Sequence, residues 1–148
     1  MYKIAHTSHF YLNQIHEIEA DCFPDPWSVS ALKYEIDLPN SICLMALDEK
    51  GTQAVGHISM RHVINEGHIS NIAVAKAHRR AGVGKLLLQA LINEAMQREM
   101  IALTLEVRIG NQAAINLYEK FGFVTEGHRK NYYSSPTEDA LIMWKHII

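Results

Sequence analysis

The sequence predicts an α/β fold in which helices flank a mixed central β-sheet. Strand patterns over 41–48, 53–64 and 68–74 follow one another through short turns, which is typical of an antiparallel meander. A helix pattern over 83–97 and another strand pattern over 102–107 come next. A strand–helix–strand unit of this kind forms a right-handed parallel crossover, so the sheet must contain both orientations.

Before the meander, the chain shows a short strand pattern at 2–5 and two helix patterns. Apolar residues recur at helical spacing over 10–22, and two prolines in the segment 23–28 end that helix. Ser28 then caps a second helix that runs to 37. Trp27 lies in the loop between the helices, where it is compatible both with packing into the core and with forming a wall of a substrate site.

A short helix and two strands complete the predicted fold. The pattern over 111–121 predicts a helix that ends at Gly122, because glycine commonly follows the last helical turn. The patterns over 124–131 and 139–147 predict a final pair of strands. With 148 residues and no linker or repeat, we expect residues 1–148 to form a single domain.

Composition and charge restrict the function classes. The net charge of −2 argues against a nucleic-acid-binding protein, which would carry a basic excess. No apolar run reaches membrane-spanning length and no charged-then-apolar leader is present, so we expect a cytoplasmic protein without a membrane partner. Cys22 and Cys43 have no metal-like spacing and the nine histidines are scattered, so we expect neither a disulfide nor a metal site.

The loop before the long helix is the strongest candidate for a binding site. Gly82 and Gly84 stand where the loop turns into the helix, and the free N–H groups of a helix N-terminus form an anion site. Glycine lets a phosphate approach the main chain, and the neighbouring arginines add charge and forked donors. We therefore predict a pyrophosphate site. Its residues are Arg79, Arg80, Ala81, Gly82, Val83, Gly84 and Lys85.

Two familiar phosphate loops do not fit this segment. A Walker loop would need glycine at the position of Arg79 and serine or threonine at the position of Leu86. A dinucleotide fingerprint that begins at Gly82 would need a third glycine where the chain has Leu87.

The arrangement that does fit resembles the acetyl-CoA loop of the GNAT acetyltransferases. It consists of Arg79-x-x-Gly82-x-Gly84 after a strand that ends in Asn71-Ile72-Ala73-Val74. The segment Asn111-x-x-Ala114-x-x-Leu117-Tyr118-Glu119-x-x-Gly122-Phe123 is similar to the signature that follows the fifth strand in these enzymes. The resemblance implies a GNAT fold, with acetyl-CoA as co-substrate and no metal.

Further segments resemble one branch of that family, the RimI-like ribosomal-protein-alanine N-acetyltransferases. They are Phe23-Pro24-x-Pro26-Trp27-Ser28, Leu105-Glu106-Val107-Arg108, Asn131-Tyr132-Tyr133 and Glu138-Asp139-Ala140-Leu141-Ile142-Met143. The resemblance implies transfer of acetyl to the free α-amine of a ribosomal protein with alanine first and a basic segment after it. Alternatives are an acetyltransferase for lysine side chains or small amines, and a non-catalytic acyl-CoA-binding module. Each of these three functions is compatible with a requirement for a partner subunit.

The resemblance also implies roles for individual residues. Glu106 would be the general base and Tyr118 the general acid, although a salt-bridged strand glutamate and a core aromatic explain the same residues. Asn111 would contact the cofactor or merely cap its helix. The cofactor arm would bind the main chain at Ile72, Ala73 and Val74, where the N–H of Val74 would serve as oxyanion donor.

The substrate side of the predicted site rests on three aromatic residues and one acid. Trp27 would form a wall, and Tyr132 or Tyr133 would hold the peptide backbone. Glu138 would favour a basic peptide, or would simply be a solvated turn residue.

Overall fold

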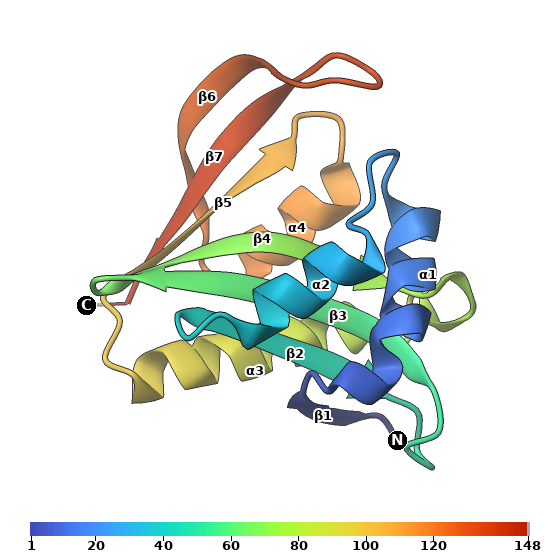
Figure 1. Ribbon diagram of the computed structural model, residues 1–148. Helices are drawn as coiled ribbons and strands as arrows, with labels where there is room; N and C mark the ends of the chain where they lie inside the picture. Colours follow the sequence, from blue (N-terminus) through green and yellow to red (C-terminus); the bar gives the residue numbers. More distant parts are fainter. Residues whose placement is uncertain (148) are drawn as a thin grey trace.

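The computed structural model describes residues 1–147, and within them one mixed sheet has seven strands in the order β1-β2-β3-β4-β5-β7-β6 (Figure 1). The strands are β1 (Lys3–His6), β2 (Ser41–Leu47), β3 (Ala54–Val63), β4 (Glu66–Val74), β5 (Ala102–Arg108), β6 (Val124–Tyr133) and β7 (Glu138–His146). Neighbouring strands are antiparallel except β4 and β5, which are parallel. The predicted α/β fold, with its meander and crossover, is confirmed.

Helices cover both faces of the sheet. Figure 1 shows α1 (Leu12–Cys22) and α2 (Val29–Asp37) in front of β2–β4, with α3 (Val83–Gln97) behind them and α4 (Gln112–Lys120) beside β5 and partly behind β4. The 3₁₀ turns η1 (His9–Tyr11) and η2 (Lys76–His78) lie before α1 and α3. Every helix within residues 1–147 falls short of the length and apolarity needed to cross a bilayer.

Because helices cover both faces, two apolar layers form. The larger one lies between the sheet and α3, where Leu87 and Leu91 are fully buried against Ile58. The smaller one joins α1 and α2 to the sheet through Ile15 and Leu32. Central strands are therefore buried on both sides.

The second layer is also fixed by a polar contact. Glu35 of α2 accepts hydrogen bonds from both Arg61 of β3, at 2.8 and 3.0 Å, and Ser41 at 2.6 Å. The hydrogen bond from Arg61 holds the pKa of the Glu35 carboxyl below its usual range. The ion pair attaches α2 to the sheet beside the predicted site.

The sheet opens between β4 and β5. These strands pair only from Glu66–Ile69 with Ala102–Leu105. One residue further, Ser70 has no counterpart on β3, because Met60 faces Ile69 while Ser59 faces Asn71. A bulge of this kind bends a strand. β5 stays paired with β7 along its whole length, so the two halves of the sheet part beyond Ile69.

Candidate active site

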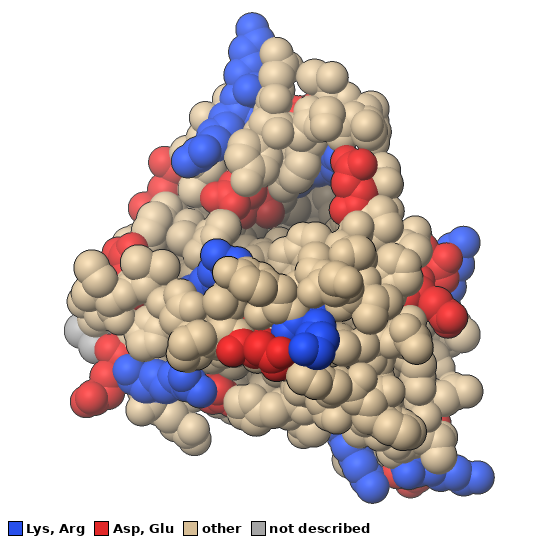
Figure 2. Space-filling model, in the orientation of Figure 1, with Lys and Arg blue, Asp and Glu red and all other residues tan. Residues whose placement is uncertain are grey.

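Two cavities of about 700 and 720 Å³ meet at this opening. We call the first the front cavity; Trp27, Glu106, Tyr118, Tyr132 and Tyr133 are among its lining residues. Figure 2 shows this face of the molecule hollowed, with acidic side chains near the rim. We call the second the loop cavity, because the loop before α3 forms one wall. The residues that line both are Cys22, Phe23, Ile72, Asn111 and Ala114.

The loop cavity has the features of the predicted pyrophosphate site. Gly82 adopts a left-handed conformation with φ of 86°, and a Cβ there would meet no atom within 4 Å. The helix begins at the next residue, so the N–H groups of its first turn have no helical acceptor and form the positive end of the helix dipole. Arg80 and Lys85 line the same cavity, whereas Ala81 does not.

Arg79 lines the loop cavity but already has partners in the protein. Its Nε donates to the carbonyl of Val74 at 3.1 Å, and its Nη2 lies 3.3 Å from Cys22 Sγ. These contacts tie the loop to β4 and to the end of α1. Binding of phosphate by this side chain stays a prediction.

The register of β3 and β4 directs main-chain groups of β4 into the opening. The N–H of Ala75 donates to the carbonyl of Val55 at 2.8 Å, and hydrogen-bonded pairs alternate with non-bonded pairs along an antiparallel ladder. Val74 and Ile72 therefore belong to non-bonded pairs, opposite Gly56 and Ile58. Their N–H groups point away from β3, towards the side where β5 has left the sheet. Ala73 instead bonds to β3, and its side chain is buried under α1.

Glu106 lies on β5 at the floor of the front cavity, on the polar face opposite the buried Leu105 and Val107. Its carboxylate oxygen Oε1 lies 2.7 Å from Nε2 of His68 on β4. Sequence reasoning missed His68. The signal was available in the parallel pairing of β4 with β5, which places alternate residues of both strands on one polar face.

Tyr118 comes from α4 and closes the cavity from the other side of the opening. The ring is buried, with an exposed fraction of 5%, and packs against Phe123 at a centroid distance of 5.6 Å. Burial raises the pKa of the Tyr118 phenol, so the group stays protonated well above neutrality. In the described part of the chain its hydroxyl has no hydrogen-bond partner.

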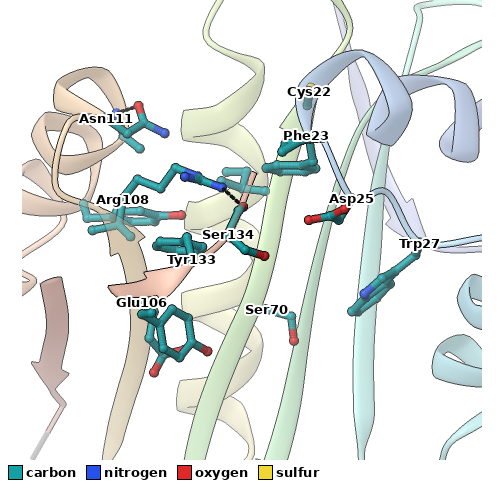
Figure 3. Close-up of a pocket in the computed structure, with 16 residues that line it drawn as sticks. Cys22, Phe23, Asp25, Trp27, Ser70, Glu106, Arg108, Asn111, Tyr133 and Ser134 are labelled. Carbon is teal, nitrogen blue, oxygen red and sulfur yellow. Dashed lines mark hydrogen bonds between the residues drawn. The ribbon is translucent and has the colours of Figure 1, made fainter. Parts of the chain in front are cut away.

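Tyr133 and the turn after it are organised by Arg108 (Figure 3). The guanidinium carbon lies 4.4 Å from the centroid of the Tyr133 ring, and the nitrogens donate to the carbonyls of Ser134 and Pro136 at 3.2 and 3.0 Å. Burial, followed by the nearby Tyr132, raises the pKa of Tyr133 to about 12. Tyr132 packs edge-on against Tyr133 at 4.9 Å.

Glu138 is held at the edge of the site and does not line the front cavity. One carboxylate oxygen accepts from Arg108 at 3.1 Å and the other accepts from the N–H of Gly110 at 2.8 Å. The carboxylate therefore faces an arginine of its own chain. The structure does not bring Glu138 together with the tyrosines as a cavity residue.

Trp27 and Asn111 occupy opposite ends of the cavity. Figure 3 shows Trp27 on the loop after α1, across the cavity from Glu106. Its carbonyl lies 2.8 Å from Nδ1 of His16, which fixes the loop to α1. Asn111 caps α4, since its Oδ1 accepts from the N–H of Ala114 at 3.2 Å, and it also lies where the cavities join. Both interpretations of Asn111 are thus compatible with its position.

Among the residues that the structure describes, no three histidine, cysteine or acidic side chains gather in a way that could hold a metal ion. Cys22 and Cys43 are free thiols.

Comparison with known proteins identifies the family. Residues 12–123 match the model of the acetyltransferase (GNAT) family. A candidate ribosomal protein bS18-alanine N-acetyltransferase from Bacillus subtilis is 35% identical over 133 residues, which is 90% of this chain and 87% of the relative. The crystal structure of the ribosomal-protein-S18-alanine N-acetyltransferase from Escherichia coli has a TM-score of 0.90 at 32% identity, covering 99% of this chain and 94% of that one.

A third solved structure contains the co-substrate. A candidate streptothricin acetyltransferase from Bacillus anthracis, solved in complex with acetyl coenzyme A, has a TM-score of 0.68 at 32% identity. The match covers 78% of this chain and 68% of that one. The fold, the family model and these relatives agree: the chain belongs to the GNAT acetyltransferase family, in the branch of the ribosomal-protein-alanine N-acetyltransferases.

Proposed function

We propose that this protein transfers acetyl from acetyl-CoA to the free N-terminal amine of a ribosomal protein that begins with alanine. The observation that carries the proposal is the junction of the two cavities, with Glu106 on one side and Tyr118 on the other. A site of this shape lets a cofactor and a peptide approach one point from opposite directions. Two of the relatives named above, from Escherichia coli and Bacillus subtilis, carry the name of ribosomal-protein-alanine N-acetyltransferases, which supports the same substrate here.

The loop cavity fits the pyrophosphate of acetyl-CoA. The open space over Gly82 and the first N–H groups of α3 would bind phosphate oxygens, with Arg79, Arg80 and Lys85 adding positive charge. Ala81 and Val83 would contribute only through the main chain. The outward N–H of Ile72 would bond the pantetheine arm, and that of Val74 would stabilise the oxyanion.

The front cavity supplies the acid and the base. An α-amine titrates at about 7.7–8.0, so much of it is charged at pH 7 and must lose a proton before it attacks. The Glu106 carboxylate would accept that proton through a water molecule before the neutral nitrogen attacks, and would release it to solvent. As the C–N bond forms, the nitrogen would lose its second proton by the same route. As the C–S bond breaks, Tyr118 would donate its phenolic proton to the CoA thiolate and later recover one from solvent.

The walls of the front cavity would hold the peptide. Trp27 faces the tyrosines across the cavity, and the Tyr132–Tyr133 pair is fixed by Arg108. We propose that these side chains position the first residues of an extended basic segment. Glu138 would act indirectly in this scheme, by holding Arg108. Residues 1–148 would act as one domain in the cytoplasm.

Substitution of Gly84 tests the cofactor site. A Cβ at Gly84 would meet Leu117 at 3.4 Å and Ile72 at 3.8 Å, which are ordinary contacts, so Gly84→Val is expected to fold. Its methyl groups would occupy the loop cavity and lower acetyl-CoA affinity by about 10- to 100-fold. Titration calorimetry measures the change. Gln89→Val, an exposed change on the same helix, is the matched control. Equal affinity in a folded Gly84→Val protein would contradict the assignment.

The substrate is tested with three peptides of one basic sequence that begins with alanine. The first has a free N-terminus and acetylated lysines, the second a blocked N-terminus and free lysines, and the third has both free. We expect the first and third to be acetylated on the α-amine, as located by fragmentation mass spectrometry, and the second to remain unmodified. Acetylation of lysine with an untouched α-amine would instead favour the lysine or small-amine alternative.

A further inference from the structure

A histidine and the proposed base lie side by side where β4 and β5 part. Nε2 of His68 is 2.7 Å from Oε1 of Glu106, although His68 is in register with Thr104, two residues earlier on β5. The side chain of Glu106 is 15% exposed and lines the front cavity, whereas that of His68 is 43% exposed. The pair therefore connects the floor of the cavity to solvent.

Tyr132 is a neutral neighbour of Glu106, because burial and then the nearby Glu106 carboxylate, with which its phenol shares a hydrogen bond, raise the pKa of Tyr132. The other charged or titratable side chains around the pair are engaged elsewhere or neutral. They are Arg61, Glu35, Tyr133 and Arg108. Arg61 lies opposite His68 on β3, but its charge is paired with Glu35 of α2. Arg108 is bound to Glu138 and stacked on Tyr133. Among the described residues, His68 is thus the single basic side chain in direct contact with Glu106.

We propose that His68 is a positioning residue for acetyl transfer, which orients the Glu106 carboxylate by donating a hydrogen bond from Nε2. This inference rests on the proposed function, because it assigns Glu106 as the base. The contact at 2.7 Å engages one carboxylate oxygen of a residue that lines the front cavity.

The hydrogen bond fixes the tautomer of His68. An ionised carboxylate only accepts hydrogen bonds, so Nε2 carries the proton of this contact and Nδ1 is the bare nitrogen. The hydrogen bond holds the Glu106 carboxylate in one orientation. A proton that leaves the attacking nitrogen passes through water to Glu106, and it returns from Glu106 to solvent through the cavity once the product has left.

The experiment compares two variants of His68 with the wild type at pH 7. His68→Leu cannot donate to Glu106, whereas the amide of His68→Gln still can. We expect kcat of His68→Leu to fall about tenfold, with KM for peptide and for acetyl-CoA within about twofold, and His68→Gln to recover most of that loss. His146→Leu is the matched control, since His146 contacts Glu126 of β6 at 2.9 Å and lines neither cavity.

A double variant separates the orienting hydrogen bond from a purely structural role. In a Glu106→Gln background, His68→Leu should lower kcat no further, because no carboxylate is left to orient. A His68→Leu kcat equal to the wild type, a His68→Gln kcat no higher than that of His68→Leu, or a further loss in the Glu106→Gln background would overturn the proposal. If the wild type acetylates only lysine, the proposed function fails, while the same His68 comparison can be made with the lysine peptide.

Discussion

Glu106→Gln is expected to lower kcat/KM at pH 7 by about 10²-fold, because the attacking amine loses the group that accepts its proton. Glutamine keeps the shape and polarity of the side chain but is not a base. The deficit should narrow above pH 8, where most of the α-amine is already neutral in solution. Initial rates from pH 6 to 9, with product quantified by mass spectrometry, give both profiles.

Glu126→Gln provides the matched control for this experiment. Glu126 also lies beside a histidine, His146, but on β6 away from both cavities, so its loss should leave the profile unchanged. Acetyl-CoA affinity should be normal in both variants. A Glu106→Gln profile that parallels the wild type at full amplitude would exclude Glu106 as the base and leave water or a histidine.

The order of the elements could be predicted from the sequence because it depends on local patterns. Ser28 caps α2 as expected, with its hydroxyl accepting from the N–H of Ala31 at 3.0 Å. Gly122 ends the helix pattern with φ of 90°, a conformation that glycine adopts easily. The β-α-β crossover follows from the strand and helix patterns on either side of Gly82. In each case, the deciding residues are close in the chain.

Contacts within the site could not be predicted in the same way, because they depend on the register between distant strands. From the sequence, Glu138 is compatible with facing a basic peptide and with being a solvated turn residue, whereas the pairing of β5 with β7 puts Arg108 within 3.1 Å of it. His68 was grouped with the scattered histidines, since its partner lies 38 residues away on a parallel strand. The charge of each side chain could be predicted from its residue type. The three-dimensional structure was needed to find which charged side chains pair with one another.

The opening between β4 and β5 explains why so many of these residues act together. The bulge at Ser70 separates the strands, and the separation frees the outward N–H groups of Ile72 and Val74. The same separation creates the space above Glu106 and lets the ring of His68 reach it. In the proposed mechanism, cofactor binding, oxyanion stabilisation and proton removal would thus all depend on one interruption in sheet pairing.

Tyr118→Phe is expected to reduce the rate of acetyl transfer by about 10²-fold and to leave acetyl-CoA affinity near normal. Its ring would still pack against Phe123, and no hydrogen bond within the described residues would be lost. The free energy of unfolding should therefore change by less than about 1 kcal/mol. The variant lacks only the proton donor for the departing sulfur, which would otherwise leave as a thiolate, the conjugate base of a thiol that titrates near 8.5.

Single-turnover rates are the proper measurement, because slow product release could hide a change in the chemical step. Tyr34→Phe, an exposed tyrosine of α2, is the control for loss of a phenolic hydroxyl. Burial raises the pKa of Tyr118, so the wild-type rate should show no alkaline loss due to this phenol up to about pH 9. A normal single-turnover rate in Tyr118→Phe would show that the residue only fills the core. An alkaline limb near pH 8 that disappears in the variant would contradict the protonated phenol, because the acid would then ionise within the working range of the enzyme.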